Sequence, residues 1–323
     1  MLRIDSIRLK TNIDVIKDID LNYFNETIKT DLKNGKNIGN NKFAIKKDVK
    51  PVGLGNIIID KETVIIDMSG KILKSDYYNL INKNTIFNAL GNINSPAVSF
   101  DKYKLLESQV LKLDITNNIQ VEKNIKKYIQ MIYLFSKNSD KYNINKYKYS
   151  GLVFVKNNAT KKLKDRLITY NKTIEIIKDK QMLELIKDID KFKNVLRFES
   201  NLRTFQQIRK RLDLDKKIIT LKDVLVVKAK VNYNFFNEIL KTASAPIQFI
   251  NKEKTPIQII KEIGFNAIHK ELGIKKAKEF IKVITGKNSD PYSIISQMKK
   301  AVNINLESNN NYINEIKDKL KAV

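Results

Sequence analysis

The chain has 323 residues, of which 61 are lysine or arginine and 35 are aspartate or glutamate, giving a formal net charge of +26. It has no cysteine and a single histidine, which excludes disulfides, thiolate zinc sites, cysteine nucleophiles and a histidine pair for metal binding. Such a charge favours a polyanionic partner, DNA or RNA, and any metal ion needs oxygen ligands, which favours Mg²⁺ or Mn²⁺.

The sequence shows no sign of a membrane partner. No segment approaches the roughly 18 consecutive apolar residues that a spanning helix needs. Charged residues also occupy the stretch from Met1 to Lys10, where a signal peptide has its apolar core. The sequence therefore predicts a cytoplasmic protein.

The first two thirds of the chain alternate strand-like with helix-like segments. Residues 56–60 and 63–68 form a predicted hairpin, because two β-branched runs flank a two-residue turn. Residues 137–150, rich in Asn, Lys and Tyr, are predicted to be a loop. The other predicted strands are 2–9, 109–116, 151–156, 165–172 and 194–203, and the predicted helices are 76–90, 119–136 and 173–190.

From residue 213 onward the pattern becomes helical. Thr255-Pro256 and Asp290-Pro291 each join an N-cap residue to a proline at the first helical position, so a helix is predicted at each. The stretch 259–284 is compatible with a helix-turn-helix DNA reader. We predict an α+β fold: a largely antiparallel sheet with flanking helices in a catalytic domain, 1–212, followed by a mainly helical C-terminal domain, 213–323, which is a candidate for DNA binding.

Three predicted strands carry polar side chains opposite their apolar face, since side chains alternate along a strand. The polar positions are Asp114 in the first strand, Glu199 in the second, and Arg166, Tyr170 and Lys172 in the third. If these strands are neighbours with aligned faces, two carboxylates, a tyrosine hydroxyl and cationic groups converge on one surface.

Such a surface is suited to cutting a phosphodiester bond. Carboxylates can hold a divalent ion that offsets charge on the scissile phosphate, and a tyrosine hydroxyl can attack in line. Because the ordinary pKa of tyrosine is about 10, a nearby metal ion or a cation such as Lys172 must help to deprotonate it.

The order and wording of these segments resemble a known family. Leu111-Lys-Leu-Asp-Ile-Thr, Gly151-Leu-Val-Phe-Val, Leu167-Ile-Thr-Tyr-Asn-Lys-Thr-Ile-Glu and Val195-Leu-Arg-Phe-Glu-Ser-Asn-Leu-Arg follow one another as in rolling-circle replication initiators of the filamentous-phage gene II/X type and related plasmid initiators without a histidine pair. The resemblance covers about residues 100–205. Most rolling-circle initiators carry a His-hydrophobic-His metal motif, so the match is to the histidine-free branch.

The resemblance implies a site-specific, single-strand DNA endonuclease and strand transferase that initiates phage or plasmid replication in a bacterial cell. It implies that Tyr170 is the nicking nucleophile and forms a 5′-phosphotyrosyl intermediate. It also implies that Asp114 and Glu199, with Glu175 as a third candidate, are ligands of Mg²⁺ or Mn²⁺. The implied partners are single-stranded or cruciform origin DNA and, as a candidate, a host helicase.

Several basic residues are candidates for contacts to DNA phosphates. The basic segment after the Glu199 strand and the basic hairpin tip at 156–164 are two such regions. The candidate residues are Arg166, Arg197, Arg203, Arg209, Lys210 and Arg211. Gly53-Leu-Gly lacks a following lysine-bearing phosphate loop, so no cofactor-binding motif is predicted.

Two alternatives stay open from the sequence. One is a mobilisation relaxase, which performs the same chemistry at a transfer origin. The other is a DNA- or RNA-binding protein without enzymatic activity, such as a plasmid initiator with paired winged-helix domains. The oligomeric state is open as well.

Overall fold

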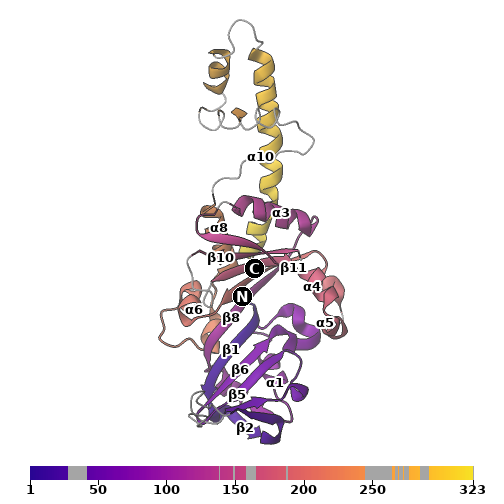
Figure 1. Cartoon of the computed structure of the whole chain (residues 1–323), viewed down its shortest axis with the longest axis vertical. Helices are drawn as coiled ribbons and strands as arrows, with labels where there is room; N and C mark the ends of the chain where they lie inside the picture. Colours follow the sequence, from indigo (N-terminus) through magenta and orange to yellow (C-terminus); the bar gives the residue numbers. More distant parts are fainter. Residues whose placement is uncertain are drawn as a thin grey trace, which may run out of the picture.

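A ten-stranded antiparallel sheet, with helices packed against it, organises the part of the chain that the structure describes (Figure 1). The structure is a computed structural model that describes residues 1–27, 42–137, 139–147, 150–157, 165–186, 188–243 and 291–322, with short helical pieces within 264–283. Thr255-Pro256, most of the candidate helix-turn-helix stretch and residues 158–164 of the predicted hairpin tip 156–164 lie outside these residues. The predicted α+β class is confirmed.

The strands of the large sheet differ greatly in length, and the longest, β8, lies near its centre. A separate pair consists of β2 (Ile16–Ile19) and β7 (Val98–Phe100). In spatial order the large sheet consists of β3 (Phe24–Thr27), β4 (Lys42–Ile45), β5 (Leu54–Ile59), β6 (Thr63–Ser69), β1 (Ile4–Asn12), β8 (Gln109–Gln120), β12 (Val195–Leu202), β11 (Arg166–Asn171), β10 (Gly151–Lys156) and β9 (Tyr142–Tyr147).

The helices gather along the sheet and at its upper end in Figure 1. They are α1 (Ile86–Asn92), α2 (Lys102–Leu106), α3 (Ile125–Ser136), α4 (Lys172–Lys178), α5 (Lys180–Leu185), α6 (Phe205–Leu212), α7 (Leu221–Val226), α8 (Val231–Lys241) and α10 (Pro291–Ala322). Short 3-10 helices are η1 (Ile13–Val15), η2 (Leu21–Tyr23), η3 (Lys47–Val49), η4 (Gly70–Asn79) and η5 (Ile189–Phe192).

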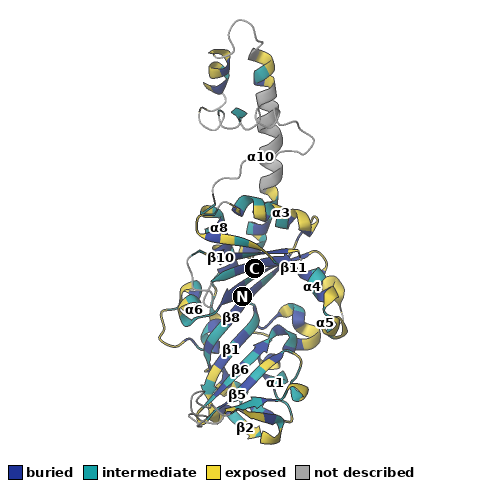
Figure 2. Ribbon diagram, in the orientation of Figure 1, coloured by how far each residue is buried: buried dark blue, intermediate teal, exposed yellow. Residues whose placement is uncertain are grey.

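Two apolar cores fill one face of the sheet, and both are buried in Figure 2. The first joins β1, β5, β6 and part of β8 to α1, α6 and α7. The second joins β10, β11 and β12 to α3, α8 and the C-terminal end of α10, where Phe198 packs edge-on against Phe236. Because α8 and the end of α10 belong to this core, segments after residue 213 pack directly on the sheet. Within the described residues, no helix is both long and apolar enough to cross a membrane.

Four segments differ from their predicted boundaries. The helix predicted at 76–90 is replaced by η4 and α1, because Leu80 adopts a positive φ of 55° and the adjacent Ile81 pairs with Ile4 of β1. The helix predicted at 173–190 is divided into α4 and α5, since the extended Asp179 caps the second of them. The helix predicted at 119–136 begins only at Ile125, as β8 continues to Gln120. The loop predicted at 137–150 contains the edge strand β9.

Candidate active site

A row of polar side chains crosses the face of the sheet that the two large cores leave free. In β12, Arg197, Glu199 and Asn201 alternate with buried residues that are apolar except for Ser200. The register places Tyr170 of β11 opposite Arg197, and Asp114 of β8 opposite Asn201. Directly paired residues of antiparallel strands share a face. The three strands are therefore neighbours with aligned polar faces.

A small apolar cluster covers one end of this row. It brings together side chains from η4, α4, α5 and η5, including Tyr77, Ile176 and Phe192. Tyr77 stacks on Phe192 with 6.1 Å between ring centroids, and its hydroxyl reaches Arg197 and Lys172. The polar groups below it are thereby removed from water, which makes each unpaired charge there costly.

Arg197 is the central cation of this covered region and is fully buried. Its Nη1 lies 3.2 Å from Asp5 Oδ2 and 3.1 Å from the Tyr77 hydroxyl oxygen, and its Nε donates to Asn118 Oδ1 at 2.8 Å. Burial alone would raise the pKa of Asp5, but Arg197 and then Lys172 outweigh it and hold that pKa below its ordinary value. Arg197 was predicted to contact DNA, but it is buried and binds Asp5, Asn118 and Tyr77 inside the protein.

Lys172, the first residue of α4, is also buried, with 1% of its surface exposed. Its ammonium donates to the Tyr77 hydroxyl at 2.8 Å and forms an ion pair with Glu175. Burial, followed by repulsion from Arg197, lowers the pKa of Lys172 to about 8. Lys172 and Glu175 thus bind each other on the covered side of the row.

Tyr170 and Glu199 form the pair of side chains that is best placed for acid–base chemistry. The Tyr170 hydroxyl donates toward Glu199 Oε2 at 3.4 Å, and Glu199 Oε1 accepts from Asn201 Nδ2 at 2.7 Å. Burial is the main cause that raises the pKa of Tyr170 well above its ordinary value. Burial, with the nearby charges of Asp5 and Asp114, raises the pKa of Glu199 to about 7. Near neutral pH, Glu199 is therefore able both to accept and to release a proton.

Asp114 lies beyond Asn201 in the same row and has 7% of its surface exposed. Its Oδ1 is 3.3 Å from Arg203 Nη2. Burial raises the pKa of Asp114 to about 6 even though Arg203 opposes the shift. The Thr116 Oγ1 atom is buried without a hydrogen-bond partner among the described residues, whereas Asp114 Oδ1 faces the Arg203 guanidinium. The Thr116 hydroxyl is thus available to a cation or a donor from outside.

The side-chain oxygens of Asp114, Glu199 and Thr116 are suited to one kind of metal site. Among the described residues, no group of three or more His, Asp or Glu side chains is arranged to share a metal ion. Mg²⁺ is nevertheless often bound by one or two carboxylates, completed by water and by the phosphates of a substrate. Asp114 and Glu199, with the Thr116 hydroxyl beside them, match this sparse arrangement.

The predicted DNA-contacting residues fall into different environments. Arg203 is 28% exposed and lines a cavity of about 330 Å³ on the polar face, together with Ser6, Arg8 and Lys112. Arg211 is instead held by Asp165 and Glu238 at 2.6 and 2.8 Å, and it stacks on a phenylalanine ring. Its guanidinium links the residue before β11 to α8.

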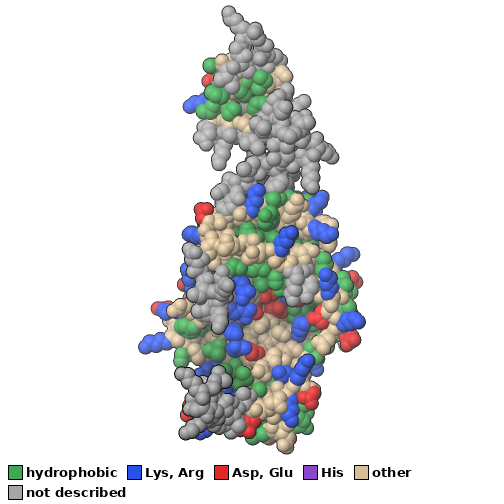
Figure 3. Space-filling model, in the orientation of Figure 1, with side chains coloured by type: hydrophobic (Ala, Val, Ile, Leu, Met, Phe, Trp, Pro, Cys, Tyr) green, Lys and Arg blue, Asp and Glu red, His purple; other side chains and the backbone are tan. Residues whose placement is uncertain are grey.

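Other predicted DNA-contacting residues lie nearer the surface. Arg209 is half-exposed and paired with Asp215, and Lys210 is exposed on the same helix, α6. Arg166, at the start of β11, stands opposite Asn201 in the polar row. Figure 3 shows Lys and Arg side chains over the whole described part of the visible face, so charge alone does not single out one DNA surface.

Asp5, Tyr77 and Asn118 complete the site but were not predicted from the sequence. Asp5 lies at a register shift between Ile4 and Ser6 of β1, where simple alternation fails. Tyr77 lies in η4, which has no repeating apolar pattern. Of these three residues, only Asn118 could have been predicted from the sequence, since it continues the alternation of Asp114 and Thr116 along β8.

Comparison with protein-family models, with curated proteins and with solved structures finds no match to this chain. The functional interpretation therefore depends on the site itself and on the motif resemblance.

Proposed function

We propose that the chain nicks one strand of origin DNA, with Tyr170 as nucleophile, and so initiates rolling-circle replication of a phage or plasmid in the bacterial cytoplasm. The observation that carries the proposal is the Tyr170 hydroxyl beside Glu199, on the same face of the sheet as Asp114. Origin DNA is then the partner, and a host helicase would extend the nick into unwinding.

The chemistry requires a base for the Tyr170 proton. Glu199 Oε2 is an acceptor 3.4 Å from the hydroxyl oxygen, and the raised pKa of Glu199 suits it to that task. The Tyr170 oxygen then bonds to phosphorus, the phosphorus–O3′ bond breaks, and the departing 3′ oxygen takes up a proton. The product is a 5′-phosphotyrosyl link and a free 3′ hydroxyl, which a polymerase can extend.

A divalent ion has a defined place in this proposal. Mg²⁺ or Mn²⁺ held by Asp114 and Glu199 would offset the negative charge that develops on the scissile phosphate. Arg203, which pairs with Asp114, and Lys112 line the adjacent cavity and would contact the neighbouring phosphates of the strand.

The proposal is tested by incubating the purified chain with supercoiled DNA that carries its own gene and flanking sequence, with Mg²⁺ or Mn²⁺. A denaturing gel should show a nicked product and DNA linked to protein, and chelation of the ions should prevent both. Tight DNA binding without nicking or linkage in either metal would contradict the proposal and favour a DNA-binding protein without enzymatic activity.

The nicking rate is expected to rise with pH between about 5 and 8 and then to level off. Glu199 must be a carboxylate in order to accept the Tyr170 proton or to bind the cation, and in the absence of a bound ion its pKa is about 7. Asp114, with a pKa of about 6, steepens the lower part of the same limb. Single-turnover nicking measured across this range tests the prediction. A rate that is constant from mildly acidic to neutral pH would count against a role for either carboxylate.

A further inference from the structure

A second basic cavity lies on the other face of the central sheet. It has a volume of about 460 Å³, and Ile115 and Asn117 of β8 line it. Asp114 and Thr116 belong to the alternate positions of the same strand and point to the proposed nicking site. The two sites are therefore separated by the sheet and can be altered independently.

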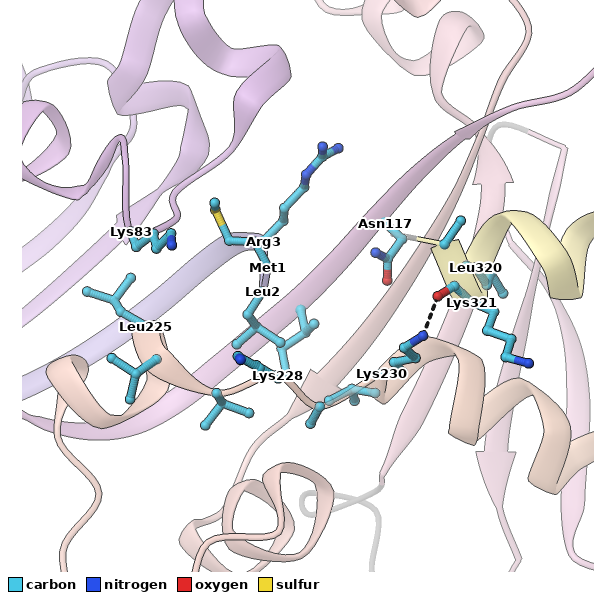
Figure 4. A pocket seen from close by; sticks show the side chains of 16 residues that line it. Met1, Leu2, Arg3, Lys83, Asn117, Leu225, Lys228, Lys230, Leu320 and Lys321 are labelled. Carbon is cyan, nitrogen blue, oxygen red and sulfur yellow. Dashed lines mark hydrogen bonds between the residues drawn. The ribbon is translucent and has the colours of Figure 1, made fainter.

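Four segments that are distant in the sequence build the walls (Figure 4). They are the residues before β1, the loop before α1, the connection between α7 and α8, and the end of α10. The lining residues include Arg3, Lys83, Lys228, Lys230 and Lys321, and Figure 4 shows the Arg3 side chain pointing away from Lys228 and Lys230. No aspartate or glutamate is among the lining residues.

These cations are poorly neutralised. The ion pairs found within the described residues do not include Arg3, Lys83, Lys228 or Lys321. Lys230 donates to the backbone carbonyl of Lys321 at 2.6 Å, which Figure 4 shows as a dashed line. Like charges that share a concave, partly apolar space attract anions and lower their repulsion by binding one.

Neutral donors add to the positive character. The helix α8 begins at this cavity, and its N-cap residue Lys230 makes no side-chain hydrogen bond to the first turn, which contains no acidic residue. Asn117 Oδ1 accepts from Asn232 Nδ2 at 2.6 Å, which fixes the amide and leaves its amino group as a donor on the wall. Uncapped amides of a helix start favour phosphate oxygens.

The rest of the wall is apolar, with Leu2, Leu225, Val227 and Leu320 among its residues. A ligand that fits both parts carries phosphate groups and an apolar ring, and the volume lies in the usual range of small-molecule sites. We propose that this cavity binds a nucleotide through its phosphates. A free nucleoside triphosphate and the phosphorylated end of a DNA strand share this chemistry.

Fluorescence titrations with two probes test the proposal: mant-ATP, and a short 5′-phosphorylated, dye-labelled oligodeoxynucleotide, both near physiological salt. Lys228→Glu and Lys83→Glu should each weaken binding of at least one probe by about tenfold or more. Lys61→Glu changes an exposed lysine in the turn between β5 and β6 and should weaken binding by less than about twofold, as expected for an exposed charge outside the site. Pyrophosphate should displace mant-ATP if that probe binds.

The pattern of effects identifies the source of the phosphate. Loss of mant-ATP binding assigns a free nucleotide, whereas a loss restricted to the oligonucleotide assigns the end of a strand. Equal effects of all three substitutions on both probes, or no binding of either probe, would overturn the proposal. Tyr170→Phe should leave the titrations unchanged, so a failure of the nicking proposal does not affect this test.

Discussion

Tyr170→Phe is expected to reduce nicking and DNA linkage below detection, a loss of roughly 10⁴-fold or more, as for removal of other covalent nucleophiles. The substitution removes one oxygen atom, the phenolic oxygen that donates toward Glu199. The ring itself should stay in place. It packs against Tyr147 at 5.5 Å between centroids, and Gly151 is so close that an added Cβ would lie 2.6 Å from the Tyr170 Cβ.

The measurement is the same gel assay, combined with DNA binding and thermal unfolding of the variant. Binding and unfolding should be nearly unchanged, because the hydrogen bond from the Tyr170 hydroxyl to Glu199 is long, at 3.4 Å. Tyr103→Phe is the matched control, since Tyr103 is 74% exposed and distant from the site in the fold. A Tyr170→Phe protein that nicks at more than about a tenth of the normal rate would exclude Tyr170 as the nucleophile.

Arg197→Met is expected to lower the free energy of unfolding by about 3–5 kcal/mol. Methionine fills much of the same volume but leaves the Asp5 carboxylate, Asn118 and the Tyr77 hydroxyl without their shared partner. The loss of one partner of a buried ion pair costs more than the pair contributes, because the remaining charge is uncompensated. Urea denaturation followed by circular dichroism gives the change directly.

Two further variants separate the destabilisation by Arg197→Met from a general effect of losing a positive charge. Arg209→Met removes a half-exposed arginine from a surface pair and should cost less than about 1 kcal/mol. Asp5→Asn, added to Arg197→Met, should recover part of the stability, since it removes the carboxylate left without a partner. Equal destabilisation by the two arginine substitutions would show that Arg197 does not organise the site.

The alternation of polar and apolar side chains allowed the central strands of the sheet to be predicted from the sequence. β8, β11 and β12 each show a period of two, so the shared face of Asp114, Tyr170 and Glu199 could be predicted before their pairing was known. Strand β9 escaped prediction because it lies at the edge of the sheet. There only Tyr142 among its six residues is buried, and the polar residues around it resemble a loop.

Other parts of the site depend on tertiary contacts that leave no periodic signal. The alternation of β12 places Arg197 on the polar face, where an arginine is ordinarily exposed to solvent. It is buried because the apolar cluster around Tyr77 packs over it. Asp5 reaches Arg197 through a local register shift, which alternation does not predict. The predicted helix 76–90 is interrupted at Leu80 because the next residue pairs with β1. The predicted helix 173–190 is interrupted at Asp179 because this residue caps α5.

The most direct test of the central claim is to locate the covalent bond. The normal chain would be trapped on nicked origin DNA, the DNA trimmed with nucleases, and the protein digested for mass spectrometry. The account predicts a nucleotide attached through phosphate to Tyr170 in the peptide that joins β11 to α4. A nick without any linked peptide, or a linkage to a different residue such as Tyr147, would contradict it.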